Sequence, residues 1–303
     1  MKTNIYFFVL VFASVMSYGQ QNAQFTQYMY NTININPAYA GSRGALSIFG
    51  LYRTQWVGLD GAPKTSCFSV NTPLNNSNLG LGVSLVNDKI GPTNENNFSV
   101  DISYTIHPSE TLKLSFGFKA TANLFNLDVN KLNPVEQSDP QFQNFNNVFK
   151  PNFGAGVYLH SNKGYVGLSV PNLAETNLYN DNDIAIYKSR INYYLIGGYV
   201  FDLGPDVQFK PSTLIKMVEG SPLQVDVSAN FRIVDKFVIG AAYRWDATFS
   251  AMAAFQISES LNIGYGYDLE TTNLRNYNSG SHEIFLRFEI FKNNGNMTTP
   301  RFF

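Results

Sequence analysis

The segment LQVDVSANFRI, residues 223–233, decides the fold prediction because apolar and polar residues alternate along its whole length. Val225 and Val227 belong to the apolar row, whereas Gln224 and Asp226 belong to the polar row. Successive side chains of a β-strand point to opposite faces, so this segment has one apolar face and one polar face. Its length suits a tilted strand that crosses a bilayer, which takes roughly 9–11 residues. The segment therefore predicts a membrane-spanning β-strand.

The composition agrees with a membrane barrel and excludes several other classes. The chain has 303 residues, of which 15% are aromatic and 14% charged, with a net charge of −1. Charged residues make up about a quarter of an ordinary soluble domain, so this chain is poor in charge. Beyond residue 20 no apolar run reaches the length of a membrane helix. The near-neutral charge argues against nucleic acid as a partner.

The same alternation recurs along the chain and predicts a transmembrane antiparallel outer-membrane β-barrel of about 14 strands. Residues 112–124 and 98–106 show it most clearly, since each holds one apolar and one polar row. The strand-like segments are 44–52, 65–72, 78–87, 97–107, 110–124, 150–160, 163–170, 190–203, 207–217, 223–234, 236–246, 248–257, 259–270 and 280–291.

The connections between these segments alternate in length. Long loops are expected at 53–64, 88–96, 125–149, 171–189 and 271–279, and short turns after the even-numbered strands. Outer-membrane barrels place short turns on the periplasmic rim and long loops on the outer rim. Two short connections, near residues 220–222 and 246–247, depart from the pattern. An even strand number puts both chain ends on the periplasmic side.

Closure of the sheet directs the apolar rows to lipid and the polar rows to the lumen, because a bilayer cannot satisfy an open sheet edge. The lumen is then lined by charges of both signs and by many glycines. This combination suits a lumen that is crossed by ion pairs and filled by a loop or plug more than a pore selective for one ion sign. The expected lumen charges are Lys113, Lys119, Lys210, Lys216, Arg232, Arg244 and Arg287 with Asp101, Asp226, Asp268, Glu283 and Glu289, and the glycines are Gly80, Gly82, Gly117, Gly154, Gly156, Gly240, Gly264 and Gly266.

The predicted organisation has four parts. Residues 1–19 have the charged start, apolar core and small-residue end of a secretory signal peptide. Residues 20–43 form a periplasmic lead-in, a possible plug, that tucks into the barrel mouth. Residues 44–291 form the transmembrane barrel, and residues 292–303 form a polar tail. The tail is either flexible or docked on a periplasmic partner.

No catalytic, cofactor-binding or metal-binding constellation stands out. His107, His160 and His282 are scattered at strand ends and do not have metal-ligand spacing, although a barrel could bring two of them together. Cys67 is the single cysteine, so no intramolecular disulfide can form, and a small buried or lipid-facing side chain is expected. Asp88 with Gly91 indicates a turn rather than a calcium site.

A series of short motifs in the first ninety residues resembles the PorP/SprF family of type IX secretion system outer-membrane proteins. The motifs are NPAYAG at 36–41, YRTQW at 52–56, GAPKT at 61–65, GLG at 80–82 and DKIGP at 88–92. Each is weak alone, but the series is specific, and the resemblance covers essentially the whole mature chain. The lead-in at 21–25 is looser than the usual family start.

The resemblance implies a non-enzymatic outer-membrane barrel without cofactors. Its partners would be a large secreted adhesin with a C-terminal secretion domain, periplasmic ring or lipoprotein components of the machinery, and outer-membrane lipid. It would assist export or surface retention of the adhesin, or contact the ring. The long outer loops are the expected partner surface. The candidate family-motif and partner-contact residues are Asn36, Pro37, Tyr39, Gly41, Arg53, Gln55, Trp56, Gly61, Pro63, Asp88 and Gly91.

Two other functions remain open from the residues alone. One is an outer-membrane channel or hydrophobic small-molecule transporter, which requires an apolar path through the lumen. The other is a barrel enzyme that depends on one of the three histidines. Trp56 is expected either to anchor the barrel at the membrane interface or to form part of a partner surface, with the anchor preferred.

Overall fold

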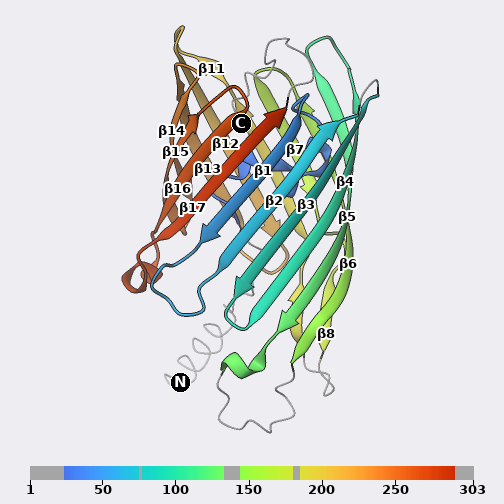
Figure 1. Cartoon of the computed structure of the whole chain (residues 1–303), viewed down its shortest axis with the longest axis vertical. Helices are drawn as coiled ribbons and strands as arrows, with labels where there is room; N and C mark the ends of the chain where they lie inside the picture. The colour runs from blue at the N-terminus through green and yellow to red at the C-terminus, as the bar shows by residue number, and fades with distance from the viewer. Residues whose placement is uncertain (1–23, 75–76, 133–143, 180–184, 291–303) are drawn as a thin grey trace, which may run out of the picture.

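The computed structural model describes residues 24–74, 77–132, 144–179 and 185–290, and its long strands pair antiparallel with their sequence neighbours (Figure 1). The strands are β1 (Leu46–Thr54), β2 (Lys64–Pro73), β3 (Leu79–Ile90), β4 (Thr93–Ile106), β5 (Lys113–Leu127), β6 (Phe145–His160), β7 (Gly164–Val170), β8 (Thr176–Tyr179), β9 (Ala185–Ser189), β10 (Asn192–Tyr199), β11 (Phe201–Asp202), β12 (Val207–Val218), β13 (Gln224–Ile233), β14 (Phe237–Arg244), β15 (Thr248–Gln256), β16 (Leu261–Glu270) and β17 (Ser281–Ile290).

The sheet closes on itself at two seams. Strand β1 pairs with β17, from Leu46 opposite Ile290 to Thr54 opposite His282. Strand β10 pairs with β12, with Asn192 opposite Val218. Strands β8 and β9 form a separate hairpin, and β11 continues the path of β10 along β12. The cylinder therefore has fourteen antiparallel strands, as the sequence predicts.

The two faces of the cylinder differ as the alternation predicts. On β4, Phe98 and Ile102 point outward and are 49% and 47% exposed, whereas Asp101 points inward and is fully buried. Strand β13, which contains the segment used for the fold prediction, places Asp226 inside and Val227 outside. The apolar rows thus form the outer surface and the polar rows the lumen. Among the described residues, no helix is long and apolar enough to cross a membrane.

We call the rim that carries the connections after β1, β3, β5, β7, β12, β14 and β16 the long-loop rim. The opposite rim, where β17 ends and β1 begins, is the short-turn rim. The long-loop rim lies at the bottom of Figure 1 and includes the short helices η4 (Val129–Leu132) and η5 (Asn273–Tyr277). Every connection on the short-turn rim is short.

The predicted long loop at 88–96 is wrong. Strands β3 and β4 continue to Ile90 and Thr93 and leave only a tight turn at Gly91, whose φ is +52°. Likewise β5 and β6 extend through parts of the predicted loop 125–149. On β3 and β4 the added strand residues are largely polar, and Asn96 accepts a hydrogen bond from Asn87 at 2.9 Å. Apolar alternation is needed only where a strand meets hydrocarbon, so it disappears while the backbone ladder continues.

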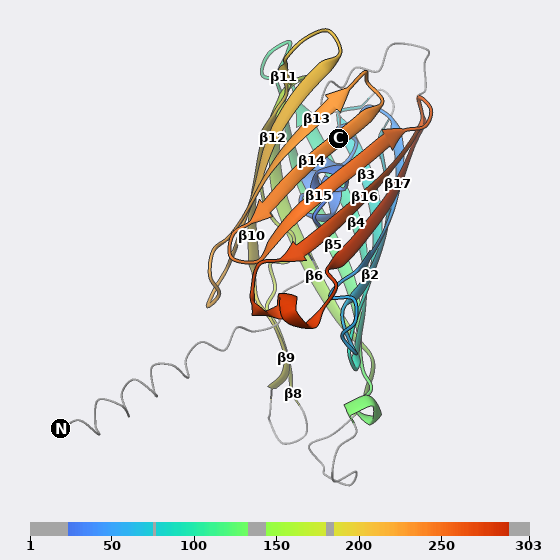
Figure 2. The same ribbon diagram turned by 90° about the vertical axis from the view of Figure 1, so that its left-hand side faces the viewer.

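A segment that precedes β1 runs through the lumen (Figure 2, blue). We call residues 24–45 the inner segment. It contains the 3-10 helices η1 (Tyr28–Tyr30), η2 (Thr32–Asn34) and η3 (Pro37–Tyr39), and nearly all of its side chains from residue 25 to 40 are buried. It starts near the long-loop rim and reaches the short-turn rim, where β1 begins. The predicted signal peptide 1–19, residues 20–23 of the predicted lead-in and the tail 292–303 lie outside the described residues.

Candidate functional site

The inner segment is anchored near the long-loop rim by a buried ion cluster. The backbone N–H groups of Thr26 and Gln27 donate to the Glu283 carboxylate at 3.1 and 2.8 Å. The Thr26 hydroxyl donates to Asp268 at 2.7 Å. Arg53 pairs with Asp268 at 2.7 Å and with Glu283 at 3.1 Å, and none of these three side chains is more than 2% exposed. We call Arg53, Asp268 and Glu283 the ion cluster.

Arg53 lies in the ion cluster inside the barrel, whereas its motif was expected in the outer loop 53–64. Its guanidinium lies inside the lumen and also donates to the Thr26 hydroxyl at 3.2 Å. Removal of one member of a buried ion pair leaves an uncompensated charge, which typically costs about 3–5 kcal/mol. Arg53 therefore ties the inner segment to the wall rather than presenting a charge to a partner.

The middle of the inner segment contacts the wall through polar side chains. The Asn31 amide donates to Cys67 Sγ at 3.1 Å, which buries the single cysteine against the segment. Lys119 on β5 donates to the Ile33 carbonyl at 3.2 Å and pairs with Asp101 at 3.2 Å. The predicted lumen position of Lys119 and Asp101 is confirmed. Their charges neutralise each other inside the barrel and leave no single-sign path at this level.

Glycines in the wall allow the backbone of the inner segment to approach closely. A Cβ atom at Gly117 would collide with the backbone N–H of Ala38, and one at Gly156 would collide with the Asn36 amide. Asn36 caps η3 by accepting from Ala38 N–H at 3.0 Å, and its Nδ2 donates to the Val157 carbonyl at 3.0 Å. We call Gly80, Gly82, Gly117 and Gly156, which all meet the inner segment in this way, the glycine cradle.

The NPAYAG motif thus forms the second half of the inner segment. Pro37 occupies the first turn of η3, where its fixed φ suits a helix start. The Tyr39 ring packs edge-on against Tyr158 with ring centroids 5.5 Å apart. Gly41 has φ +70°, a conformation that glycine adopts readily. The motif therefore specifies how the chain crosses the lumen.

The short-turn end of the inner segment has its own anchors. Ser103 donates to the Ala40 carbonyl at 2.7 Å. The Arg43 guanidinium forms a two-point contact with the Glu289 carboxylate, in which Nη2 lies 2.9 Å from Oε2. Both side chains of this pair are less than 10% exposed. The segment is therefore held at both ends and along its middle.

The other motifs converge on the long-loop rim. The Gln55 N–H donates to the Pro63 carbonyl at 2.9 Å, which closes the β1–β2 loop. The Gly91 N–H donates to the Gly61 carbonyl at 2.8 Å and joins that loop to the β3–β4 turn. Gly61 has φ +74°, and a Cβ there would press on Gly91. Three motifs separated in sequence thus build one rigid corner.

Trp56 and Asp88 attach this corner to the barrel. The Trp56 indole N–H donates to Glu270 at 2.9 Å, and its backbone N–H donates to Ser281 Oγ at 3.2 Å. Thr65 donates to Asp88 at 2.7 Å. Glu270 is a buried lumen-facing residue, so the indole N–H points to the inner side. This geometry differs from the interfacial lipid anchor preferred from the sequence.

The corner encloses a cavity of about 450 Å³, which we call the rim pocket. Val57 at its edge is 36% exposed, so the pocket offers some apolar surface beside its polar backbone. It is lined by Thr54, Gln55, Trp56, Val57, Gly58, Leu59, Asp60, Gly61, Ala62, Lys64, Lys89 and Gly91.

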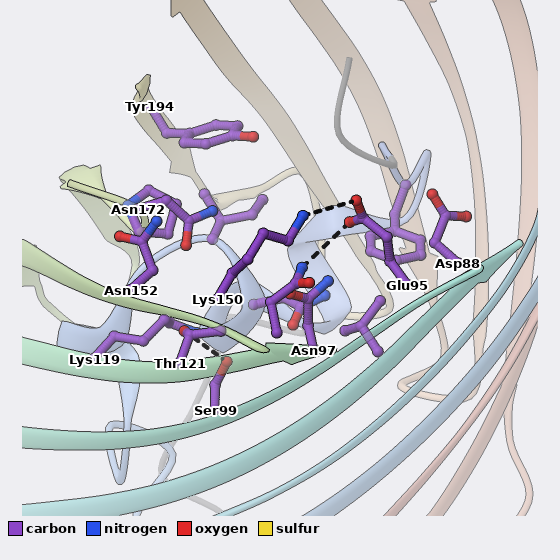
Figure 3. A pocket seen from close by; sticks show the side chains of 16 residues that line it. Asp88, Glu95, Asn97, Ser99, Lys119, Thr121, Lys150, Asn152, Asn172 and Tyr194 are labelled. Carbon is purple, nitrogen blue, oxygen red and sulfur yellow. Dashed lines mark hydrogen bonds and ion pairs between the residues drawn. The ribbon is translucent and has the colours of Figure 1, made fainter. Parts of the chain in front are cut away.

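A second cavity of about 150 Å³, the vestibule, lies between the inner segment and strands β3–β6 and β10 (Figure 3). Lys150 pairs with Glu95 at 3.7 Å, and Asn123 donates to Asn97 at 2.6 Å. Tyr194 contributes an aromatic ring from the facing strand β10. The lining therefore combines amides and the Lys150–Glu95 ion pair with apolar and aromatic side chains, which suits a peptide better than a purely apolar solute.

The three histidines, on which the alternative of a barrel enzyme depends, are not gathered into one site. Within the described ranges, no group of three or more His, Cys, Asp or Glu side chains could hold a metal ion. The ring of His282 accepts from or donates to the Tyr265 hydroxyl at 2.5 Å. His107 and His160 line a common cavity at the short-turn rim. The structure thus brings two of the three histidines together and leaves the third at the opposite rim.

Sequence reasoning missed the contacts between the inner segment and the wall. Asp268 and Glu283 were expected in the lumen, but their partner Arg53 was placed in the predicted outer loop 53–64. Thr26 and Gln27 were not singled out at all. The available signal was the excess of charge and glycine on the polar rows, which indicates a filled lumen without identifying the partner of each residue.

A family model described as "Type IX secretion system membrane protein PorP/SprF" matches residues 17–288. This match includes every candidate motif residue and all of the barrel except the end of β17. No curated protein matches the chain in a sequence search.

Several solved barrels resemble the structure with low sequence identity. The outer membrane protein Omp33 of Acinetobacter baumannii has 10% identity and a TM-score of 0.48, covering 81% of this chain and 98% of that chain. The Ralstonia pickettii toluene transporter TbuX has 10% identity and a TM-score of 0.48, covering 86% and 92%. The CymD monoaromatic hydrocarbon channel has 14% identity and a TM-score of 0.49, covering 90% and 95%.

Proposed function

Because the chain belongs to the PorP/SprF family of type IX secretion system membrane proteins, we propose that it is a non-enzymatic accessory barrel that binds a large secreted adhesin at its long-loop rim. In this role it assists the export or surface retention of the adhesin, and its short-turn rim contacts the periplasmic ring or lipoprotein components. The signal peptide at residues 1–19 directs export, and both chain ends face the periplasm.

The convergence of three family motifs on one corner of the long-loop rim is the observation that supports this proposal most strongly. Gln55, Gly61 and Gly91 are joined by backbone hydrogen bonds, and Trp56 attaches them to the barrel. Loops held by a rigid scaffold are where binding residues concentrate. The rim pocket would receive a protruding side chain or turn of the adhesin, while the vestibule would contact polar groups beside it.

The occupied lumen favours a binding role over the alternative of a channel or hydrophobic small-molecule transporter. The inner segment lies across the barrel, and the described lumen charges are mainly paired, as in Lys119 with Asp101 and Arg244 with Asp226. An apolar solute would need an apolar path in place of these groups. Conductance of the purified barrel in planar bilayers should therefore be low, and a large single-channel conductance would support the channel instead.

The test compares a deletion strain with strains that carry a tagged wild-type chain or the rim variant Val57→Glu. Val57 lines the rim pocket, but its side chain takes no part in the hydrogen bonds that build the corner. Val57→Glu therefore introduces a charge into the pocket with little effect on the fold. We expect loss of adhesin from the cell surface in the deletion strain and reduced recovery of adhesin with Val57→Glu. Normal adhesin secretion and retention in the deletion strain, with neither adhesin nor ring components recovered by the wild-type chain, would contradict the proposal.

A further inference from the structure

A third cavity, of about 220 Å³, lies at the short-turn rim between the end of the inner segment and the turns that follow β2, β4 and β6. We call it the basic pocket. It is separate from the rim pocket and the vestibule, which lie toward the opposite rim. Its lining comprises Ala40, Gly41, Ser42, Arg43, Gly44, Pro73, Ser77, Asn78, Leu79, Gly80, Thr105, His107, Thr111, Lys113, His160, Ser161 and Asn162.

All ionisable groups among these lining residues are basic. Lys113 and His107 are exposed, whereas His160 is only 3% exposed. Arg43 is neutralised by Glu289, which lies outside the lining. Lys113 therefore supplies an ammonium group to the pocket, and the rings of His107 and His160 add imidazole nitrogens beside it. None of the described residues that line the cavity carries a carboxylate, in contrast to the vestibule, where Lys150 faces Glu95.

The basic pocket faces the inside of the cylinder. Thr105 belongs to the inward row of β4, and its hydroxyl bonds the Ser115 hydroxyl of β5 at 2.7 Å. His160 lies directly opposite Lys113 in the β5–β6 ladder and belongs to the inward row of β6. The ring of strands separates these groups from the outer apolar surface. An anion in the pocket would therefore arrive from the aqueous side of the rim rather than from a lipid headgroup layer.

We propose that the basic pocket binds carboxylate side chains of an acidic peptide segment from a second protein. Lys113 and His107 would pair with the carboxylates through charge-assisted hydrogen bonds. The side-chain amides of Asn78 and Asn162 would donate to and accept from the peptide backbone, which a free anion does not need. The pocket is open at the rim, where a peptide can enter from the side of the short turns.

Such a peptide would touch the inner segment where it leaves the lumen. Ala40 and Gly41 line the basic pocket, and the Ala40 carbonyl accepts the hydrogen bond from Ser103. Occupancy would therefore reinforce the seating of the inner segment. The proposed peptide site depends on the proposed function only for the identity of the partner, because the residues that would bind the peptide are all in the barrel and its inner segment.

The test uses the purified full-length barrel in non-ionic detergent and a fluorescently labelled hexaglutamate peptide, with hexaglutamine as the uncharged control. Fluorescence anisotropy should show salt-sensitive binding of hexaglutamate and none of hexaglutamine. The double variant Lys113→Gln/His107→Gln should weaken binding by about tenfold or more, because it removes both exposed basic groups. Lys236→Gln, at the β13–β14 turn of the same rim but outside the pocket, is the matched control and should change binding less than about twofold.

Three outcomes would overturn the proposal. The first is equal binding of hexaglutamate by the wild type and by the Lys113→Gln/His107→Gln variant. The second is displacement of the peptide by inorganic phosphate at equal concentration, which would indicate a site for a free oxyanion. The third is displacement by phosphatidylglycerol nanodiscs, which would indicate a lipid headgroup. These measurements use only the isolated barrel, whereas the adhesin role is tested by secretion in cells. A negative binding result can therefore be distinguished from a negative result for the adhesin role.

Discussion

Two regions hold the inner segment, and they do so by different physical means. Near the long-loop rim the ion cluster uses Arg53, Asp268 and Glu283, which depend on matched charge. In the middle of the lumen the glycine cradle depends on the absence of side chains, as at Gly117 beneath Ala38. Removal of one charge destabilises the first region, whereas addition of one methyl group destabilises the second. The ion cluster and the glycine cradle therefore differ in the substitutions that they tolerate, although both lie in the same filled lumen.

The largest expected effect is in the ion cluster. Arg53→Met keeps the side-chain length but leaves Asp268 and Glu283 as unpaired buried carboxylates. We expect the free energy of unfolding in lipid vesicles to fall by about 3–5 kcal/mol. The control is Arg275→Met, because Arg275 lies exposed in η5 on the same rim. Equal stability of the two variants in urea unfolding would contradict the stabilising role assigned to the ion cluster.

A smaller loss is expected in the glycine cradle. Gly117→Ala places a methyl group against the backbone of Ala38 and should lower the free energy of unfolding by about 1–3 kcal/mol. Gly197→Ala is the matched control, because the nearest atom to its added methyl group is a carbonyl oxygen 3.6 Å away. Identical unfolding curves for the two alanine variants would mean that the inner segment does not press on the wall at Gly117.

The rim corner should be less sensitive than either lumen region. Trp56→Phe keeps the ring but removes the indole N–H that donates to Glu270. We expect a loss of about 1 kcal/mol, typical of one hydrogen bond. Trp245→Phe serves as control, since Trp245 is 70% exposed. The heat-induced shift in gel mobility should occur at lower temperature only for Trp56→Phe, and the opposite order would contradict the assigned contact.

The smallest effect is expected at an exposed ion pair on the short-turn rim. Lys163 in the β6–β7 turn donates to Asp202 at 2.7 Å, and this hydrogen bond raises the pKa of Lys163. Any contribution of the pair to stability is present at neutral pH and is lost as the pH rises through the raised pKa of Lys163, and solvent screening keeps this contribution small. Both side chains are nearly half exposed, so Lys163→Gln should leave the unfolding midpoint at pH 7 unchanged within error. A clear shift would mean that this pair is screened less than its exposure implies.

The membrane-facing part of the fold was predictable because the bilayer imposes a strict pattern on sequence. Every predicted strand corresponds to one strand of the cylinder, and Asp101 and Phe98 point to the expected faces. Pattern reasoning failed at the long-loop ends of β3–β6. On β3 and β4 these ends are mainly polar, so the pattern around Asn94 and Asn96 predicts a loop although both residues pair with β3.

The candidate site was predictable only in part, for a related reason. Motifs close in sequence, such as those around Gln55 and Gly61, could be placed near one rim. The partners of Arg53 lie more than 200 residues away on β16 and β17, and no local pattern encodes that distance. The basic pocket likewise brings together His107 and His160, which lie on either side of β5. Their proximity follows from strand pairing and not from their spacing in the sequence.

Strand β17 contacts both ends of the inner segment. Its Glu283 accepts hydrogen bonds from Thr26 and Gln27, and its Glu289 pairs with Arg43. The same strand completes the cylinder by pairing with β1. The strand that closes the cylinder is thus also the strand that holds both ends of the inner segment. A cylinder without the inner segment would deprive Glu283 of two backbone donors and Glu289 of the Arg43 guanidinium, so we expect an empty barrel to be weakest along the strand that closes it.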